Sequence, residues 1–221
     1  MQKFDTAAPV TATLDIPAGR VRLIAADRTD TTVEVRPASA SSGRDKKAAE
    51  QTTAEYRDGV LRIVTPADKR VLGSSGSVEV IVQLPAGSRV EAKAASAEFR
   101  TTGRLGEVVF DAPHATVTVD EATTARLTTQ AGDITVGRLG GDAEIRTAKG
   151  EIRIAEAARG TVVLRTEAGS ISVDAAAGVS AALDASTSYG RIHNALRNAE
   201  GTPTLIIHAS TANGDITARS R

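Results

Sequence analysis

The sequence predicts an all-β protein: a single-stranded parallel β-solenoid of the right-handed β-helix type, preceded by an irregular β region with one short helix. Three observations lead to this prediction. The 221-residue chain is 41% hydrophobic but only 2% aromatic, so Ala, Val, Ile and Thr must fill its core. These residues suit a narrow interior bounded by strands. A short phrase also recurs about every 20 residues, and apolar and polar residues alternate within each copy, as strands require.

Residues 1–89 carry no such repeat and are expected to form an irregular first layer that caps the open end of the solenoid. The stretch "EYRDGVLRIV" is typical of a β-hairpin that turns at Asp58 and Gly59. Ser42, with Asp45 three residues later, has the spacing of a capping box and predicts a short helix near residues 43–53. We expect this cap to be continuous with residues 90–221, so that the chain forms one structural domain with two regions.

The repeated phrase defines about seven coils within residues 90–221. The clearest copies are "TTQAGDITV" (128–136), "RTAKGEIRI" (146–154), "RTEAGSISV" (165–173) and "STANGDITA" (210–218). Aligning the copies on their turn residue gives Ala97, Ala115, Gly132, Gly150, Gly169, Gly190 and Gly214. A unit this short cannot bury its own apolar face, whereas stacked coils bury it against one another. Right-handed coiling is expected from the handedness of parallel crossovers.

Equivalent positions of the stacked coils should form columns that run along the solenoid. One inward column is expected to contain Ala92, Phe110, Leu127, Ile145, Leu164, Leu183 and Ile207. A second is expected to contain Phe99, Val117, Ile134, Ile152, Ile171, Ile192 and Ile216. Thr129, Thr147 and Thr166 should stack as a ladder of hydroxyl groups at the corner. The final "GDITARSR" is expected to place polar and basic residues beside the last strand edge, which discourages end-to-end growth.

Composition argues against several classes of function. Lys and Arg balance Asp and Glu at 27 each, whereas a chain that tracks phosphates is normally basic, so no nucleic-acid partner is expected. The absence of cysteine excludes disulfides and thiolate chemistry and favours a reducing compartment. The first residues do not read as a signal peptide, and no apolar run approaches the roughly 20 residues of a membrane span. We therefore expect a soluble, cytoplasmic protein.

The stretches "LDIPAGRVRLIAADRTDTTVEVRP" and "GSVEVIVQLPAGSRVEAKAASAEFR", with the recurring "AGDITVG"-type units, resemble a known bacterial family. These are the β-strand-repeat proteins called "putative adhesin" or toastrack domains. The resemblance spans essentially the whole chain, and its motifs specify shape rather than chemistry. It implies a β-helical fold and offers no catalytic residues that could be carried over to this chain. Some members of the family are membrane-tethered or linked to envelope-stress systems.

Polar side chains that could carry chemistry are scattered along the repeat. His193 and His208 directly follow inward isoleucines, so both should point outward, in different columns. Acidic residues follow several turns and suggest a carbohydrate-active β-helix, because glycosidases use paired carboxylates. That column contains Glu98, Thr116, Asp133, Glu151, Ser170, Arg191 and Asp215, so its like charges are interrupted. No catalytic residue, metal site, cofactor or small-molecule substrate is expected.

The lengthened coils near the C-terminus supply a candidate interaction surface. The segment "TSYGRIHNALRNAEG" adds a loop over residues 194–203 and carries residue types that are enriched at interfaces. The candidate residues are Tyr189, Arg191, His193, Arg197 and His208. The leading hypothesis is a non-enzymatic scaffold or protein-interaction module that contacts a partner protein or another copy of itself. A carbohydrate-binding or carbohydrate-active β-helix is the alternative.

Overall fold

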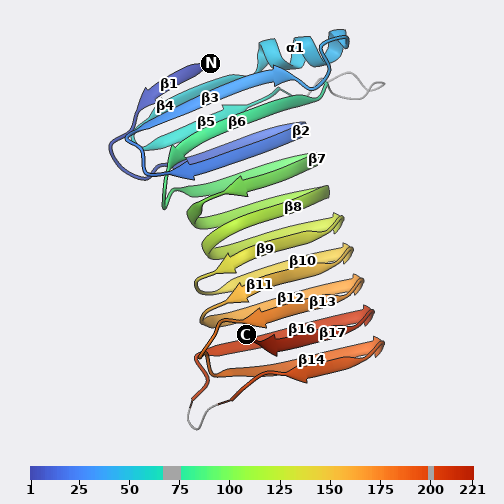
Figure 1. Ribbon diagram of the computed structural model, residues 1–221. Coiled ribbons are helices and arrows are strands. Elements are labelled where there is room, and N and C mark those ends of the chain that lie inside the picture. The colour runs from blue at the N-terminus through green and yellow to red at the C-terminus, as the bar shows by residue number, and fades with distance from the viewer. Residues whose placement is uncertain (67–75, 199–201) are drawn as a thin grey trace. The chain divides into compact units, whose positions relative to one another are not determined.

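The computed structural model describes residues 1–66, 76–198 and 202–221. This part of the chain consists mostly of strands with one short helix, and the predicted β-solenoid class is confirmed. The chain forms two compact units, Met1–Ala115 and Thr116–Arg221, and both can be followed by colour in Figure 1. The division into residues 1–89 and 90–221 remains a prediction. None of the described residues belongs to a helix that is long and apolar enough to cross a membrane.

The first unit combines parallel and antiparallel strand pairs with one helix. Its elements are β1 (Gln2–Asp5), β2 (Thr11–Ala26), β3 (Asp30–Pro37), α1 (Gly43–Gln51), β4 (Thr53–Arg57), β5 (Val60–Val64), β6 (Val78–Pro85), β7 (Arg89–Thr102) and the beginning of β8 (Arg104–Ala131). The long strand β2 pairs in parallel with β5, β6 and β7. Antiparallel pairs join β1 to β3, β3 to β6 and β4 to β5. Phe99 and Phe110 are buried in this unit, with ring centroids 4.6 Å apart.

The predicted hairpin and helix of the first unit are both present. Asp58 and Gly59 connect β4 to β5 with φ angles of 51° and 81°, the positive values that a tight hairpin turn requires. The Ser42 hydroxyl accepts a hydrogen bond from the Asp45 N–H at 3.2 Å and caps α1. The Asp45 carboxylate does not complete the capping box. It accepts hydrogen bonds from the backbone N–H groups of Ser39 and Ser77 instead.

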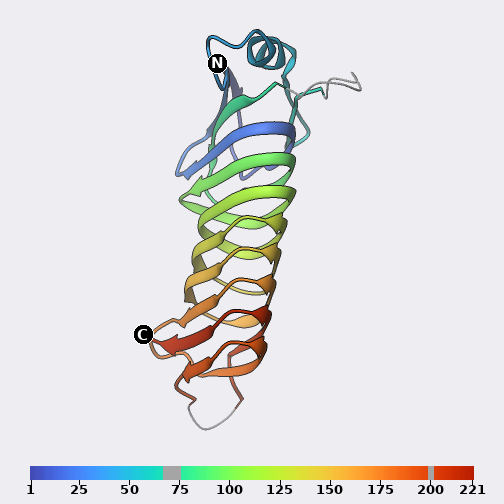
Figure 2. The same ribbon diagram turned by 90° about the vertical axis from the view of Figure 1, so that its right-hand side faces the viewer.

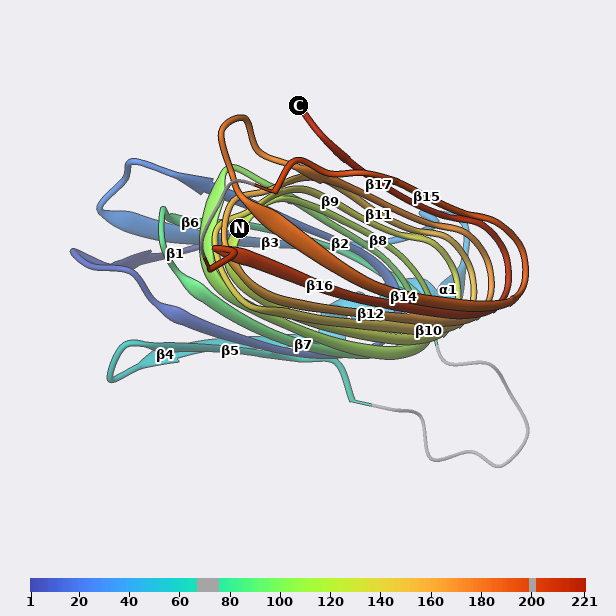
Figure 3. The ribbon, with the colours of Figure 1, turned by 90° about the horizontal axis from the view of Figure 1, so that it is seen from below.

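The second unit is built from stacked coils of two strands each, visible as successive turns in Figure 2. The strands that follow β8 are β9 (Ile134–Leu139), β10 (Ala143–Lys149), β11 (Ile152–Ala157), β12 (Gly160–Ala168), β13 (Ile171–Ala175), β14 (Ala181–Tyr189), β15 (Ile192–Ala195), β16 (Leu205–Asn213) and β17 (Ile216–Ser220). Every strand pairing described in this unit is parallel. Seen end-on in Figure 3, β10, β12, β14 and β16 lie on one side of the coil, and β9, β11, β15 and β17 lie on the other.

The last coil does not follow the order of the sequence. Strand β16 pairs with β12 on one side and β14 on the other, and β17 pairs likewise with β13 and β15. The C-terminal coil, β16 and β17, is therefore inserted between β12–β13 and β14–β15, as the red and orange strands of Figure 1 show. The expectation that "GDITARSR" lies beside the last strand edge is wrong, because β14 and β15 form the final coil.

Glycines allow adjacent turns of the second unit to approach closely. A Cβ atom on Gly169 would lie 1.9 Å from the carbonyl oxygen of Gly150, too close for any other residue without movement of the backbone. The same close approach to a carbonyl oxygen joins each neighbouring pair in a column of five glycines. In spatial order, these are Gly132, Gly150, Gly169, Gly214 and Gly190. At the predicted corner ladder, the Thr129 hydroxyl bonds to Thr147 at 2.9 Å, and the Thr166 hydroxyl donates to the Gly150 carbonyl oxygen at 3.1 Å. The hydroxyl ladder is therefore confirmed, although the turn carbonyls share in it.

For the first inward column, the predicted alignment of β16 with β12 is wrong by two residues. Ile207 pairs with Val162, and Ala209 pairs with Leu164, so the predicted neighbours Leu164 and Ile207 belong to different columns. Leu183 does pair with Ile207, as predicted. Because Gly214 stacks on Gly169, backbone hydrogen bonding fixes the register at the turn, and the nearest large apolar side chain does not decide it.

In the second unit, the second inward column contains the predicted isoleucines, but their order in space differs from their order in the sequence. Ile171 pairs with Ile216, and Ile216 pairs with Ile192. Ile152 and Ile171 are buried, whereas the side chain of Ile192 is 46% exposed. Ile192 lies in the final coil and has no further described strand to cover it. The expectation that it is a core residue is therefore wrong.

Candidate functional site

The final coil of the second unit brings several predicted interaction residues onto one surface. A hollow of about 410 Å³ is lined by Arg191, Ile192, His193, Asp215 and Thr217, from β15, β17 and the turns before them. Tyr189 ends β14, two residues before Arg191 in the chain, and is 78% exposed. We call these six residues the terminal-coil surface. It combines a tyrosine, an arginine and a partly exposed isoleucine, and the first two are residue types that dominate binding at protein interfaces.

The terminal-coil surface lies at the final coil, where the inward columns of the core end. Ile192 occupies the same column as the buried Ile216, so the alternation of the strand directs its side chain toward the interior. Because β14–β15 is the last coil, this apolar side chain meets solvent. The next position of the coil, His193, pairs with Thr217 on the outward face. Sequence position alone could not identify this exposed isoleucine, because its neighbours in the repeat are all core residues.

Two acidic residues of the column that follows the turns, Asp133 and Asp215, bind the backbone of an adjacent coil. The Asp133 carboxylate accepts a 2.8 Å hydrogen bond from the Glu151 N–H, and the Asp215 carboxylate accepts one of the same length from the Arg191 N–H. The Ser170 hydroxyl accepts from the Asp215 N–H at 3.4 Å. Each side chain thus binds the backbone of the next coil, where a glycine turn leaves an amide to be satisfied. These contacts explain Asp133 and Asp215 without any carbohydrate chemistry, and the carbohydrate alternative receives no support from them.

The other predicted interaction residues do not join the terminal-coil surface. His208 lies on β16, and its Nδ1 atom is 3.3 Å from the Asp184 carboxylate on β14. This pair belongs to the opposite side of the coil from β15 and β17 (Figure 3). Arg197 follows β15, where its N–H donates to the Ser220 hydroxyl and its carbonyl oxygen accepts from the Ala181 N–H. The five predicted residues therefore divide between two faces and a loop, and their role in binding remains a prediction.

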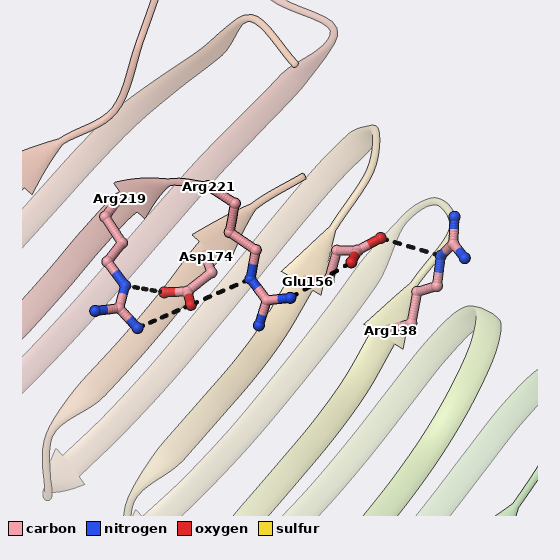
Figure 4. A network of polar contacts seen from close by, with 5 residues as sticks. All are labelled: Arg138, Glu156, Asp174, Arg219 and Arg221. Carbon is pink, nitrogen blue, oxygen red and sulfur yellow. Dashed lines mark hydrogen bonds and ion pairs between the residues drawn. The ribbon is translucent and has the colours of Figure 1, made fainter. Parts of the chain in front are cut away.

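A polar network that the sequence did not reveal crosses four strands of the second unit. The Arg219 guanidinium makes two hydrogen bonds to the Asp174 carboxylate, at 2.8 and 3.0 Å, and Asp174 is only 3% exposed. The Asp174 carboxylate raises the pKa of Arg219 through this contact. Arg221 lies 3.6 Å from both Asp174 and Glu156, and Arg138 is 3.2 Å from Glu156 (Figure 4). The network binds the C-terminal coil to the coils before it.

A second hollow, of about 450 Å³, lies in the first unit. It is lined by Thr13, Leu14, Asp15, Val60, Arg62, Ile63, Val64, Glu91, Ala92, Lys93, Val109 and Asp111. These residues come from four strands that are far apart in the sequence, namely β2, β5, β7 and β8. No local sequence pattern marks this hollow, because it depends on the pairing of β2 with both β5 and β7. Its walls combine apolar side chains with charges of both signs.

No group of three or more His, Asp or Glu side chains that could hold a metal ion occurs among residues 1–66, 76–198 and 202–221. The exposed His208 and Asp184 form a pair without a third ligand group in that part of the chain.

The chain is similar to a known protein family and to several solved structures. The family model described as Toastrack DUF4097 matches residues 13–221. No curated protein matches the chain. Among solved structures, a "putative adhesin" from Parabacteroides distasonis is 18% identical with a TM-score of 0.48, and one from Bacteroides fragilis is 11% identical with the same TM-score. A "putative lipid binding protein" from Parabacteroides distasonis is 12% identical with a TM-score of 0.44. In all three comparisons, 98% of this chain and 95% of the other are covered.

Proposed function

The protein belongs to the Toastrack DUF4097 family, and we propose that it is a non-enzymatic interaction module that binds a partner protein through the terminal-coil surface. The observation that carries this proposal is the exposure of Tyr189 and Ile192 beside Arg191. A partner that covers Ile192 would extend the buried column formed by Ile171 and Ile216. Burial of that side chain and of the tyrosine ring would supply most of the apolar contact.

The coils give such a surface a rigid support. Parallel backbone pairing and the repeated turn contacts hold β15 against β17, so the positions of Arg191 and His193 are set by the scaffold. The Arg191 backbone is further held by Asp215, while its guanidinium has no ion pair in the described part of the chain. Preorganised side chains lose little conformational freedom on binding, which favours affinity. An acidic group on the partner would match the guanidinium and suit the arginine fork.

Site-specific crosslinking tests the proposal. We would replace Tyr189 with a photoreactive amino acid in the full chain, irradiate cells that produce it, and identify the adducts by mass spectrometry. We expect one discrete partner protein, and an adduct yield at least tenfold lower when Ile192→Asp is added. Arg165 is the control position, because it is an exposed residue of β12, which lies on the opposite side of the coil from β15 and β17. Equal adducts from both positions, or insensitivity to Ile192→Asp, would refute binding at this surface.

A further inference from the structure

The insertion of the C-terminal coil has a consequence for association between copies of the chain. Strands β16 and β17, residues 205–220, fill the space between β12–β13 and β14–β15. We call this pair of strands the donor coil and the space that it fills the slot. We propose that the donor coil is exchangeable, so that two copies associate by placing the donor coil of each chain in the slot of the other. This inference goes beyond the proposed function and does not require the terminal-coil surface.

Both walls of the slot precede the donor coil in the sequence. Strands β12 to β15 are complete by residue 195, so the slot is formed by a segment to which the donor coil is added last. The donor coil is joined to that segment only through residues 196–204. Nine residues of polypeptide span at most about 30 Å, which limits the distance between a donor coil and the chain that supplies it. Exchange of an intact element through such a connection is a low-cost route to a dimer.

Most contacts that hold the donor coil are made with the two walls of the slot, and a second copy can supply them. The Ser220 hydroxyl also accepts a hydrogen bond from the N–H of Arg197, which lies outside the walls. Backbone pairing runs from Gly160 to Ala168 on one wall and from Ala181 to Tyr189 on the other. The side-chain contacts include the Arg219 hydrogen bonds to Asp174, the contact of Arg221 with Asp174 and the His208–Asp184 pair. Arg221 also reaches Glu156 on β11, in the coil beyond the wall. An exchanged coil therefore recovers the backbone pairing and the ion pairs of the original one.

The walls of the slot are also compatible with each other. Ile207 pairs with both Val162 and Leu183, and Ile216 pairs with both Ile171 and Ile192. When the donor coil leaves, β14–β15 can stack directly on β12–β13 in the same register, with Leu183 beside Val162. The apolar faces then stay covered while the donor coil is outside. Asp174 would lose Arg219 in that arrangement, and insertion of a donor coil from a second copy restores the pair.

Cysteine pairs can test the exchange because the chain contains no cysteine of its own. Ser172 and Thr217 are directly paired on β13 and β17. Paired positions of adjacent strands are about 4.8 Å apart, within the range that a disulfide can bridge. A single chain that carries both Ser172→Cys and Thr217→Cys should form an internal disulfide. This variant verifies the pairing of the two strands and is the positive control.

The decisive sample is an equimolar mixture of full-length Ser172→Cys and Thr217→Cys chains with different tags, equilibrated just below the unfolding midpoint and then oxidised. We expect a disulfide-linked dimer that carries both tags, at least fivefold above the yield from Thr135→Cys mixed with Thr217→Cys. Thr135 faces outward two coils away from the slot and reports random collisions. Adding Arg219→Ala to the donor should accelerate exchange. Equal yields from the two mixtures would overturn the proposal, as would failure of the double variant to form its internal disulfide.

Discussion

The two compact units differ in how their strands are held. In Met1–Ala115, strands pair in both directions, and contacts that occur only once, such as those of Asp45 with Ser39 and Ser77, fasten the connections. In Thr116–Arg221, every described pairing is parallel, and the same turn contacts recur from coil to coil. A unique contact specifies one neighbour. A repeated contact stabilises a coil equally well against several neighbours, so it leaves the order of the coils undecided.

The largest expected effect comes from breaking a repeated contact. Gly169→Ala would place a Cβ atom 1.9 Å from the Gly150 carbonyl oxygen, in a backbone conformation with a φ of 154°. We expect a loss of about 3 kcal/mol or more, because both overpacking and backbone strain contribute. Thermal or urea unfolding measures this loss. Gly140→Ala is the matched control, because its Cβ would lie 3.6 Å from the nearest atom. A similar loss in both variants would contradict the close approach of the turns.

A smaller effect is expected from the unique contact that binds the C-terminal coil. Arg219→Ala removes both hydrogen bonds from the buried Asp174 carboxylate, although Arg221 at 3.6 Å remains. We expect a loss of about 2 kcal/mol, since a buried acceptor is left poorly satisfied while the arginine itself is half exposed. Urea unfolding followed by circular dichroism checks the value. Arg165→Ala, an exposed arginine on β12, should change stability by less than about 0.5 kcal/mol.

In the first unit, the unique contacts of Asp45 predict a dependence on pH. Its hydrogen bond from the Ser77 N–H, with further ones from Ser42 and Ser39, lowers the pKa of this carboxyl from its usual value. A lowered pKa stabilises the folded state fully above the unfolded value and progressively less as the pH falls through the folded value. We expect Asp45→Asn to cost about 1 kcal/mol at pH 7. The difference from the wild type should narrow below about pH 4.

Unfolding midpoints of the wild type and the Asp45→Asn variant, measured from pH 7 to pH 3, test this expectation. The hydrogen bond from Arg28 also lowers the pKa of Asp30 in the same unit, but that contribution cancels in the difference between the two proteins. Glu50→Gln changes an exposed residue of α1, and its unfolding midpoint should stay close to that of the wild type at every pH. If the difference in unfolding midpoint between the wild type and Asp45→Asn stayed constant down to pH 3, the role of the charged carboxylate would be refuted.

The smallest expected effect concerns one member of the acidic column. Asp133→Ala removes the hydrogen bond to the Glu151 N–H, which lies at the surface, and should cost about 0.5–1 kcal/mol. Asp133→Asn should recover part of this loss, because its amide oxygen can still accept the bond. Hydrogen exchange of the Glu151 amide gives a direct readout, and we expect it to accelerate in the alanine variant. Unchanged exchange would mean that the carboxylate does not bind this amide in solution.

Much of the fold could be predicted from local patterns. The period of two identified the strands, Asp58 and Gly59 identified a hairpin, and Ser42 identified the start of the helix. The repeated glycines identified the turns at which the coils stack. The terminal-coil surface could be predicted only in part. Arg191 and His193 were expected to face outward, but the exposure of Ile192 follows from its place in the final coil.

The sequence by itself determined the strands, the turns, the short helix and the residues that face inward, because each depends on the spacing of neighbouring residues. Only the tertiary structure decided which coil lies beside which. Strands β14 and β16 present the same glycine, threonine and apolar positions to β12, so local spacing cannot rank them as neighbours. The arginines at the C-terminus distinguish them, since Arg219 reaches the buried Asp174, whereas the matching residue of β15 is Ala195.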